Sequence, residues 1–177
     1  MWSALPSIVV LGLVAVVAIL LAHRRSSPAD AAQARKDASA ALGVATAIQS
    51  AHFAEEWATG FQIRFPALLG LDPIPLSFFV SFNLAWIAFW IVSIPVLRLG
   101  RRPAFFAAWF LAIAGMLNCV AHPMMAIASG GYFPGLITSP IIGLASVILW
   151  QRLRSSTEET DRMIRDAARI MRNGQHD

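Results

Sequence analysis

The sequence alternates between five long apolar runs and short polar segments. The runs cover roughly residues 4–22, 38–61, 76–97, 104–128 and 136–150. Each run approaches or exceeds the ~20 residues that a helix needs to cross the hydrocarbon core of a bilayer. Apolar and polar residues do not alternate as they would along strands. The pattern therefore predicts an all-α, polytopic membrane helix bundle with five transmembrane helices.

The polar segments divide the chain into four parts. The first run ends in the basic residues 23–25, whereas a cleaved signal peptide carries its positive charge before the apolar stretch. We therefore expect residues 1–25 to remain as a transmembrane anchor helix. Residues 26–37 are then a cytoplasmic linker, residues 38–154 a four-helix membrane domain, and residues 155–177 a cytoplasmic tail.

The tail has the composition of an amphipathic helix. Ser155 and Glu158 have the spacing of a capping box at a helix N-terminus. An apolar stripe follows, made of Met163, Ile164, Ala167, Ala168 and Met171. Arginines occupy the other sides of the helix. Such a helix can lie on a membrane surface or be a solvated tail helix.

The basic residues give the spans a direction. If the N-terminus lies outside, 13 of the 14 Lys and Arg residues face the cytoplasm and only Arg64 does not, as the positive-inside rule requires. This segregation accounts for the net charge of +4 without nucleic acid, so we expect no nucleic-acid partner. Charged residues make up only 14% of the chain, whereas soluble domains have about 25%. The short, positively flanked loops favour a bacterial inner membrane.

The same orientation gathers polar residues in one leaflet. His52, Glu55 and Glu56 lie at the outward end of the second span, while Asn118 and His122 lie in the outward half of the fourth. At ~1.5 Å per residue, the second and fourth spans bring these groups to similar depth. Ionisable groups at membrane depth are costly and usually mark a functional site.

A divalent metal ion would stabilise such a group of side chains. Two imidazoles with one or two carboxylates are a common ligand set for zinc or iron, and Glu55 would be the general base on a bound water. We predict that the metal ligands are His52, Glu56 and His122, and that the catalytic residues are Glu55, Asn118 and Tyr132. The enzyme would be hydrolase-like and act on a lipid or another apolar substrate.

Two further functions stay open from the sequence alone. Without a metal, one protonated glutamate and one histidine would form an acid–base site for an isomerase or cyclase of an isoprenoid or sterol-like lipid. A non-catalytic protein that handles metal ions or protons would need a polar path to the cytoplasm. Below His52 the second span offers only Ser50, Gln49 and Thr46 for such a path.

Three motifs resemble those of the HXXEE family of small integral membrane proteins. Residues 52–56 read His-Phe-Ala-Glu-Glu, which matches the motif that names the family. Residues 118–122 resemble its Asn-x-x-x-His element, and residues 132–138 its Tyr-x-Pro-Gly-x-x-Thr element. The resemblance spans roughly residues 45–145. It implies that these residues form the site, and it names no reaction, because the family has no established activity.

Overall fold

The computed structural model describes residues 2–159, and within them the chain is all-α, as predicted. A short 3-10 helix, Trp2–Ala4, comes first. The α-helices are α1 (Leu5–Arg24), α2 (Ala32–Ala58), α3 (Phe61–Leu68), α4 (Leu76–Arg98), α5 (Arg102–Ser129) and α6 (Ser139–Ser155). Two short strands, β1 (Arg25–Ser26) and β2 (Glu158–Glu159), pair in antiparallel fashion.

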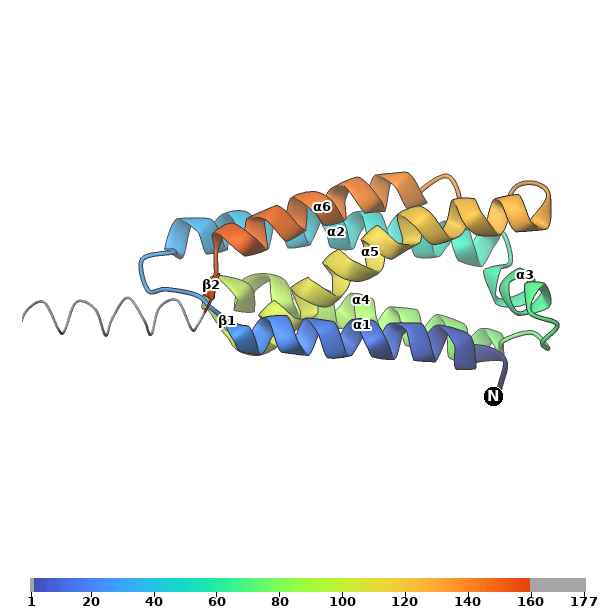
Figure 1. The fold of residues 1–177 in the computed structure, drawn as a ribbon, viewed down its shortest axis with the longest axis horizontal. Helices are drawn as coiled ribbons and strands as arrows, with labels where there is room; N and C mark the ends of the chain where they lie inside the picture. Colours follow the sequence, from blue (N-terminus) through green and yellow to red (C-terminus); the bar gives the residue numbers. More distant parts are fainter. Residues whose placement is uncertain (1, 160–177) are drawn as a thin grey trace, which may run out of the picture.

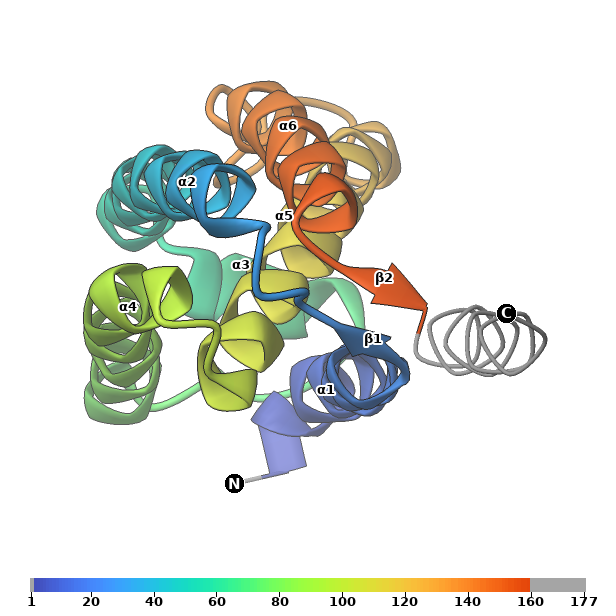
Figure 2. The ribbon, with the colours of Figure 1, turned by 90° about the vertical axis from the view of Figure 1, so that its left-hand side faces the viewer.

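The five long helices form one bundle and alternate in direction along the chain (Figure 1). The short helix α3 lies across the end of the bundle at which α1 and α4 begin (Figure 1). Seen along its axis, the bundle has α5 near the centre, with α1, α4, α2 and α6 around it (Figure 2). The buried core accordingly centres on α5, where Phe105, Trp109 and Leu111 are almost fully buried.

Three helices, α1, α4 and α5, are long and apolar enough to cross a membrane. Large apolar side chains are exposed on the outside of the bundle, as a lipid-facing surface requires. These features indicate a multi-pass membrane protein.

Helices α2 and α6 are not among these three. The 27-residue α2 is less apolar because it buries polar residues, and α6 has 17 residues, the short limit for a span. The predicted count of five spans and their orientation stay predictions.

Basic residues gather at the end of the bundle opposite α3, where α1, α4 and α6 end and α2 and α5 begin (Figure 1). Arg25 donates hydrogen bonds to the hydroxyl and the carbonyl oxygen of Thr157, at 2.8 and 2.7 Å. Arg35 donates to the carbonyl oxygen of Arg98 at the end of α4. Arg25 also donates to the carbonyl oxygen of Arg154, so Arg25 and Arg35 each bind a carbonyl group in the last turn of a helix.

The structure differs from the sequence-based expectations at the connections. The segment between the second and third apolar runs, for which no helix was predicted, contains α3, with Pro66 inside it. Helix α2 begins at Ala32, within the predicted linker. At the other end, Ser155 is the last residue of α6, and residues 158–159 pair with β1 instead of starting a new helix. The rest of the predicted tail helix, residues 160–177, lies outside the described residues.

Helices α5 and α6 pack closely because glycines lie at their contact. A Cβ atom on Gly115 would lie 2.0 Å from Oγ of Ser146 and 3.0 Å from Cγ1 of Ile142. A Cβ atom on Gly143 would lie 2.4 Å from Cβ of Cys119. Small residues that let helices approach are typical of packing inside membranes. This contact matters for function because α5 and the segment that leads into α6 both contribute to the site described below.

We expect Gly115→Ala to lower the thermal unfolding temperature in detergent, because the added methyl group overpacks the α5–α6 contact at a cost of about 1–3 kcal/mol. Far-UV circular dichroism measures the change. Gly12→Ala is the matched control, since its Cβ meets nothing within 4 Å. Equal unfolding temperatures for the two variants would contradict the close contact.

Candidate metal centre

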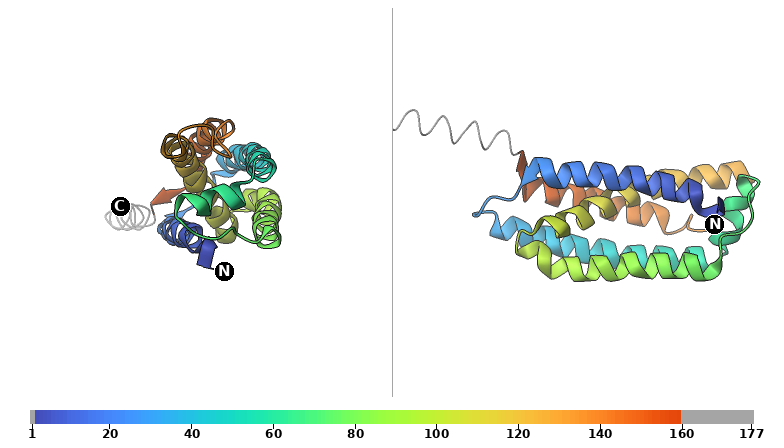
Figure 3. Two further views of the ribbon diagram at one scale, coloured as in Figure 1. Left: turned by 90° about the vertical axis from the view of Figure 1, so that its right-hand side faces the viewer. Right: turned by 90° about the horizontal axis from the view of Figure 1, so that it is seen from below.

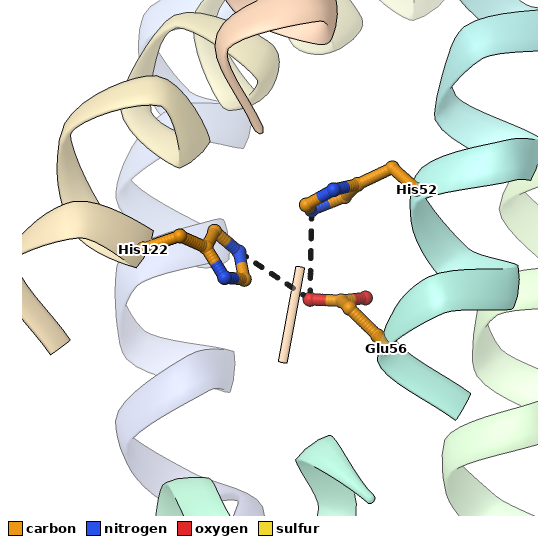
Figure 4. Close-up of side chains that lie close together, drawn as sticks. All are labelled: His52, Glu56 and His122. Atoms are coloured by element: carbon orange, nitrogen blue, oxygen red, sulfur yellow. Dashed lines mark ion pairs between the residues drawn. The ribbon is translucent and has the colours of Figure 1, made fainter. Parts of the chain in front are cut away.

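His52, Glu56 and His122 converge at the α3 end of the bundle and are called the triad below. His52 and Glu56 lie one turn apart on α2, and His122 lies on α5. All three side chains are buried, with exposed fractions of 0, 8 and 2%. Figure 4 shows both imidazoles directed at one carboxylate oxygen.

The spacing within the triad suits a shared metal ion. The Nε2 atoms of His52 and His122 lie 3.6 and 3.4 Å from Oε1 of Glu56. Both distances exceed the 2.7–3.2 Å of an ordinary N–H···O hydrogen bond. Two ligands bound to one tetrahedral zinc ion at ~2.0–2.1 Å lie about 3.4 Å apart. The three ligand atoms all lie within 4.8 Å of one another, so together they could hold a metal ion.

The backbone fixes the orientation of the His122 ring. Its Nδ1 atom lies 2.6 Å from the carbonyl oxygen of Pro134. A carbonyl oxygen only accepts, so Nδ1 carries the proton and donates it. The neutral ring therefore keeps its lone pair on Nε2, the nitrogen that faces Glu56. Histidines that bind metals commonly donate their other N–H in this way.

Thr138 fixes the orientation of the His52 ring, and it selects the same tautomer as in His122. Nδ1 of His52 lies 2.7 Å from Oγ1 of Thr138, and this hydroxyl donates its only proton to Oε2 of Glu55. The threonine oxygen therefore accepts from Nδ1–H of His52, which leaves the lone pair on Nε2. That Nε2 atom is buried and has no hydrogen-bond partner among residues 2–159. Both imidazoles thus present lone pairs to the centre of the triad.

The Glu55 carboxylate accepts four hydrogen bonds from one segment, residues 132–138. Oε1 accepts from the Tyr132 hydroxyl at 2.7 Å and from the backbone N–H of Ile137 at 3.0 Å. Oε2 accepts from the backbone N–H and the hydroxyl of Thr138. Partial burial, and then the bond to Glu55, raise the pKa of Tyr132, so the phenol keeps its proton and donates. Glu55 therefore ties segment 132–138 to α2.

The same segment lies directly against both histidine rings at Gly135. A Cβ atom on Gly135 would lie 2.5 Å from Cε1 of His122 and 2.8 Å from Cε1 of His52. The backbone angle φ of +85° also favours glycine at this position. Arg64 on α3 holds the segment from its other side, since it donates to the Tyr132 carbonyl oxygen at 2.7 Å.

A cavity of about 300 Å³ opens beside the triad and is called the lateral cavity below. Glu56 and His122 line it, and so does Asn118, one turn before His122 on α5. A metal ion held by the triad would have this cavity as an open side, the feature that distinguishes catalytic from structural zinc sites.

The chain matches a family model over residues 43–150, more than half of its length. The model is described as a protein of unknown function with HXXEE motif. The chain belongs to the HXXEE family. Comparisons with curated proteins and with solved structures give no match. In this chain the histidine and the second glutamate of the HXXEE motif belong to the triad, and the first glutamate binds segment 132–138.

The structure brings together the three residues predicted as metal ligands. The catalytic assignment of Glu55, Asn118 and Tyr132 stays a prediction. Asn118 lines the lateral cavity, whereas Tyr132 contacts Glu55. The family resemblance placed Pro134, Gly135 and Thr138 in the site through the third HXXEE-family element, but the sequence did not show that Pro134 and Thr138 orient the two histidine rings. A proline–glycine pair just before a helix was the available sign of a backbone segment that packs against the site.

We expect Glu55→Gln to destabilise the protein, because the new amide NH₂ group would face donors instead of accepting from them. Leaving a donor without a partner costs about 1–3 kcal/mol. Thermal unfolding in detergent measures the loss. Asp72→Asn is the control, because Asp72 is exposed and lies outside the HXXEE-family site. An unchanged unfolding temperature for Glu55→Gln would show that the four hydrogen bonds do not hold the segment.

Proposed function

We propose that the protein is a membrane enzyme that uses a divalent metal ion, zinc or iron, for hydrolase-like chemistry on a lipid or another apolar substrate. One observation carries the proposal: the lone pairs of two buried imidazoles converge on a single carboxylate oxygen at distances that suit metal ligands. With Glu56 ionised, these three acceptors would repel one another, and a cation between them would remove that repulsion.

The ligand set fits zinc or iron well. Two neutral histidines and one carboxylate, with a fourth position left open, form a common catalytic zinc site, and non-haem iron uses a similar set. A bound ion would supply a Lewis acid beside the lateral cavity. His52 and His122 would hold it through Nε2, and Glu56 through Oε1. Pro134 and Thr138 would keep the two rings in the required tautomer.

The remaining residues would bind and orient the substrate. Asn118 lines the lateral cavity one turn from His122, where its amide can donate to a substrate oxygen. The hydrogen bonds of Glu55 fill its lone pairs, which favours a positioning role over the role of general base. The metal-free acid–base mechanism is less well supported, because neither triad contact is short enough for a hydrogen bond.

We also propose five spans, with the N-terminus and the triad on the non-cytoplasmic side of a bacterial inner membrane. Helices α2 and α6 run alongside α1, α4 and α5 (Figure 1). The low apolarity of α2 has a local cause, because its polar residues Gln49, His52 and Glu56 are buried inside the bundle. The positive-inside rule places the basic end of the bundle in the cytoplasm.

Elemental analysis of the detergent-purified protein is expected to find stoichiometric zinc or iron. His52→Ala and His122→Ala are each expected to lose it, because two remaining ligands hold a divalent ion poorly. His23→Ala is the control and should keep the metal, because His23 is exposed near the end of α1. A protein that is free of metal, and that turns over a lipid in the presence of a chelator, would instead support the acid–base mechanism.

Labelling of single cysteines in intact cells tests the five spans. In a Cys119→Ala background, a membrane-impermeant maleimide is expected to label Ser129→Cys but not Asp30→Cys or Leu99→Cys. If only α1, α4 and α5 crossed the membrane and the N-terminus lay outside, the reagent would reach Leu99→Cys and not Ser129→Cys. Labelling after cell lysis confirms that all three positions can react, since each is exposed in the structure.

A further inference from the structure

The lateral cavity lies between α1 and α4. Both helices pack against α5 and barely touch each other. Seen from below, α5 is visible between them (Figure 3). Side chains from both helices line the cavity, and three of them are also exposed on the outside of the bundle: Ile8 and Val10 of α1 and Phe78 of α4 are 45, 50 and 41% exposed. These three residues form the mouth of the cavity.

Where α1 and α4 cross the membrane, the mouth would face the bilayer and not the water phase. Ile8, Val10 and Phe78 all lie within candidate membrane spans. Toward the α3 end of the bundle, the cavity meets Phe61 and Phe65, two side chains of α3 that stack on each other at 5.1 Å between ring centroids. A ligand would therefore enter sideways, between α1 and α4.

The interior of the cavity has two chemically different walls. One wall is aromatic and consists of Phe78, Phe79, Phe82, Trp86, Trp90 and Phe110. The other is a polar strip on α2 and α5, made of Gln49, Glu56, Asn118 and His122. A ligand that fits both walls has an apolar chain and a polar group.

Gln49 is the unexplained member of the polar strip. Its side chain is buried, and Oε1 has no hydrogen-bond partner among the residues that the structure describes. The two ends of a glutamine amide are distinguished only by their partners, so either end can turn toward the cavity. Gln49 lies seven residues before Glu56 on α2, about 10 Å along the helix. A buried amide that lacks a partner is costly, and a ligand would supply one.

We propose that the lateral cavity binds a single-chain lipid that enters from the bilayer between α1 and α4 and carries a neutral hydrogen-bonding group, a hydroxyl or an amide. Its chain lies on the aromatic wall, and its polar group lies on the strip between Gln49 and the triad. The ligand is the substrate if the proposed function holds, but its binding does not require the metal.

Size and charge narrow the ligand class. A cavity of about 300 Å³ holds on the order of ten groups the size of a water molecule, at ~30 Å³ each, which is room for one chain and not for two. No lysine or arginine lines the described part of the cavity, so an anionic phosphate group has no counter-ion there. Amides such as Gln49 and Asn118 suit a neutral group that both donates and accepts.

Photo-crosslinking in phosphatidylcholine nanodiscs tests this proposal, with diazirine-bearing dodecanol as the probe. We expect label on cavity-lining peptides of α4, and at least a several-fold loss of that label with excess unlabelled dodecanol. Ser7→Trp and Leu11→Trp place a bulky ring in the cavity and should abolish the label. Val9→Trp and Leu13→Trp are matched controls on the exposed surface of α1, and they should keep it. Gln49→Leu should weaken competition by dodecanol several-fold.

Results that differ from those expected above contradict the proposal. Label that excess dodecanol does not reduce, or that survives in both Ser7→Trp and Leu11→Trp, means that no bound lipid occupies the cavity. Stronger labelling of the cavity by a diazirine-bearing phosphatidylcholine or fatty acid means that the ligand class is wrong. Metal content, measured on the same samples, separates this test from the proposed function. Saturable labelling of a metal-free protein would end the metal hypothesis and leave the lipid site standing.

Discussion

The hydrogen bonds that Glu55 accepts from segment 132–138 are the interaction on which the rest of the site depends. They hold this segment against α2, although the bonded residues lie 77 to 83 positions apart in sequence. Once the segment is held, the carbonyl group of Pro134 meets one histidine and the hydroxyl of Thr138 meets the other. A single carboxylate thus determines the orientation of two rings on different helices.

This arrangement has an electrostatic consequence. Both imidazoles donate their Nδ1 protons away from the centre, so two imidazole lone pairs and the Glu56 carboxyl group remain around it, and all three groups are buried. A proton shared by Glu56 and one histidine would draw that pair into hydrogen-bonding distance, and neither pair is that close. Backbone and side-chain acceptors that take the other ring N–H of a histidine are typical of metal sites. The surroundings of the triad, like its three side chains, are therefore compatible with a bound metal ion.

The triad could be predicted from the sequence, but the groups that orient it could not. His52 and Glu56 are four residues apart, so a helix places them on one face, and counting depth along two spans brings His122 to the same level. The carbonyl group of Pro134 acts through the backbone, which no residue pattern records. Likewise, the lateral cavity depends on how α5 packs against α1 and α4, and side-chain packing sets the angles between helices. The apolar pattern of a sequence predicts which segments form helices. It does not predict how the helices cross or where cavities remain between them.

Chemistry and access are divided between different parts of the chain. The match to the HXXEE family begins at residue 43, after α1, and it includes every residue of the triad and of segment 132–138. One side of the mouth of the lateral cavity, however, is built from α1, which makes no contribution to the triad. Changes in α1 can therefore alter which molecules reach the site while the ligand geometry stays the same. If the proposed function and the proposed lipid site hold, proteins that share the motif residues but differ in their first helix keep one reaction and differ in substrate.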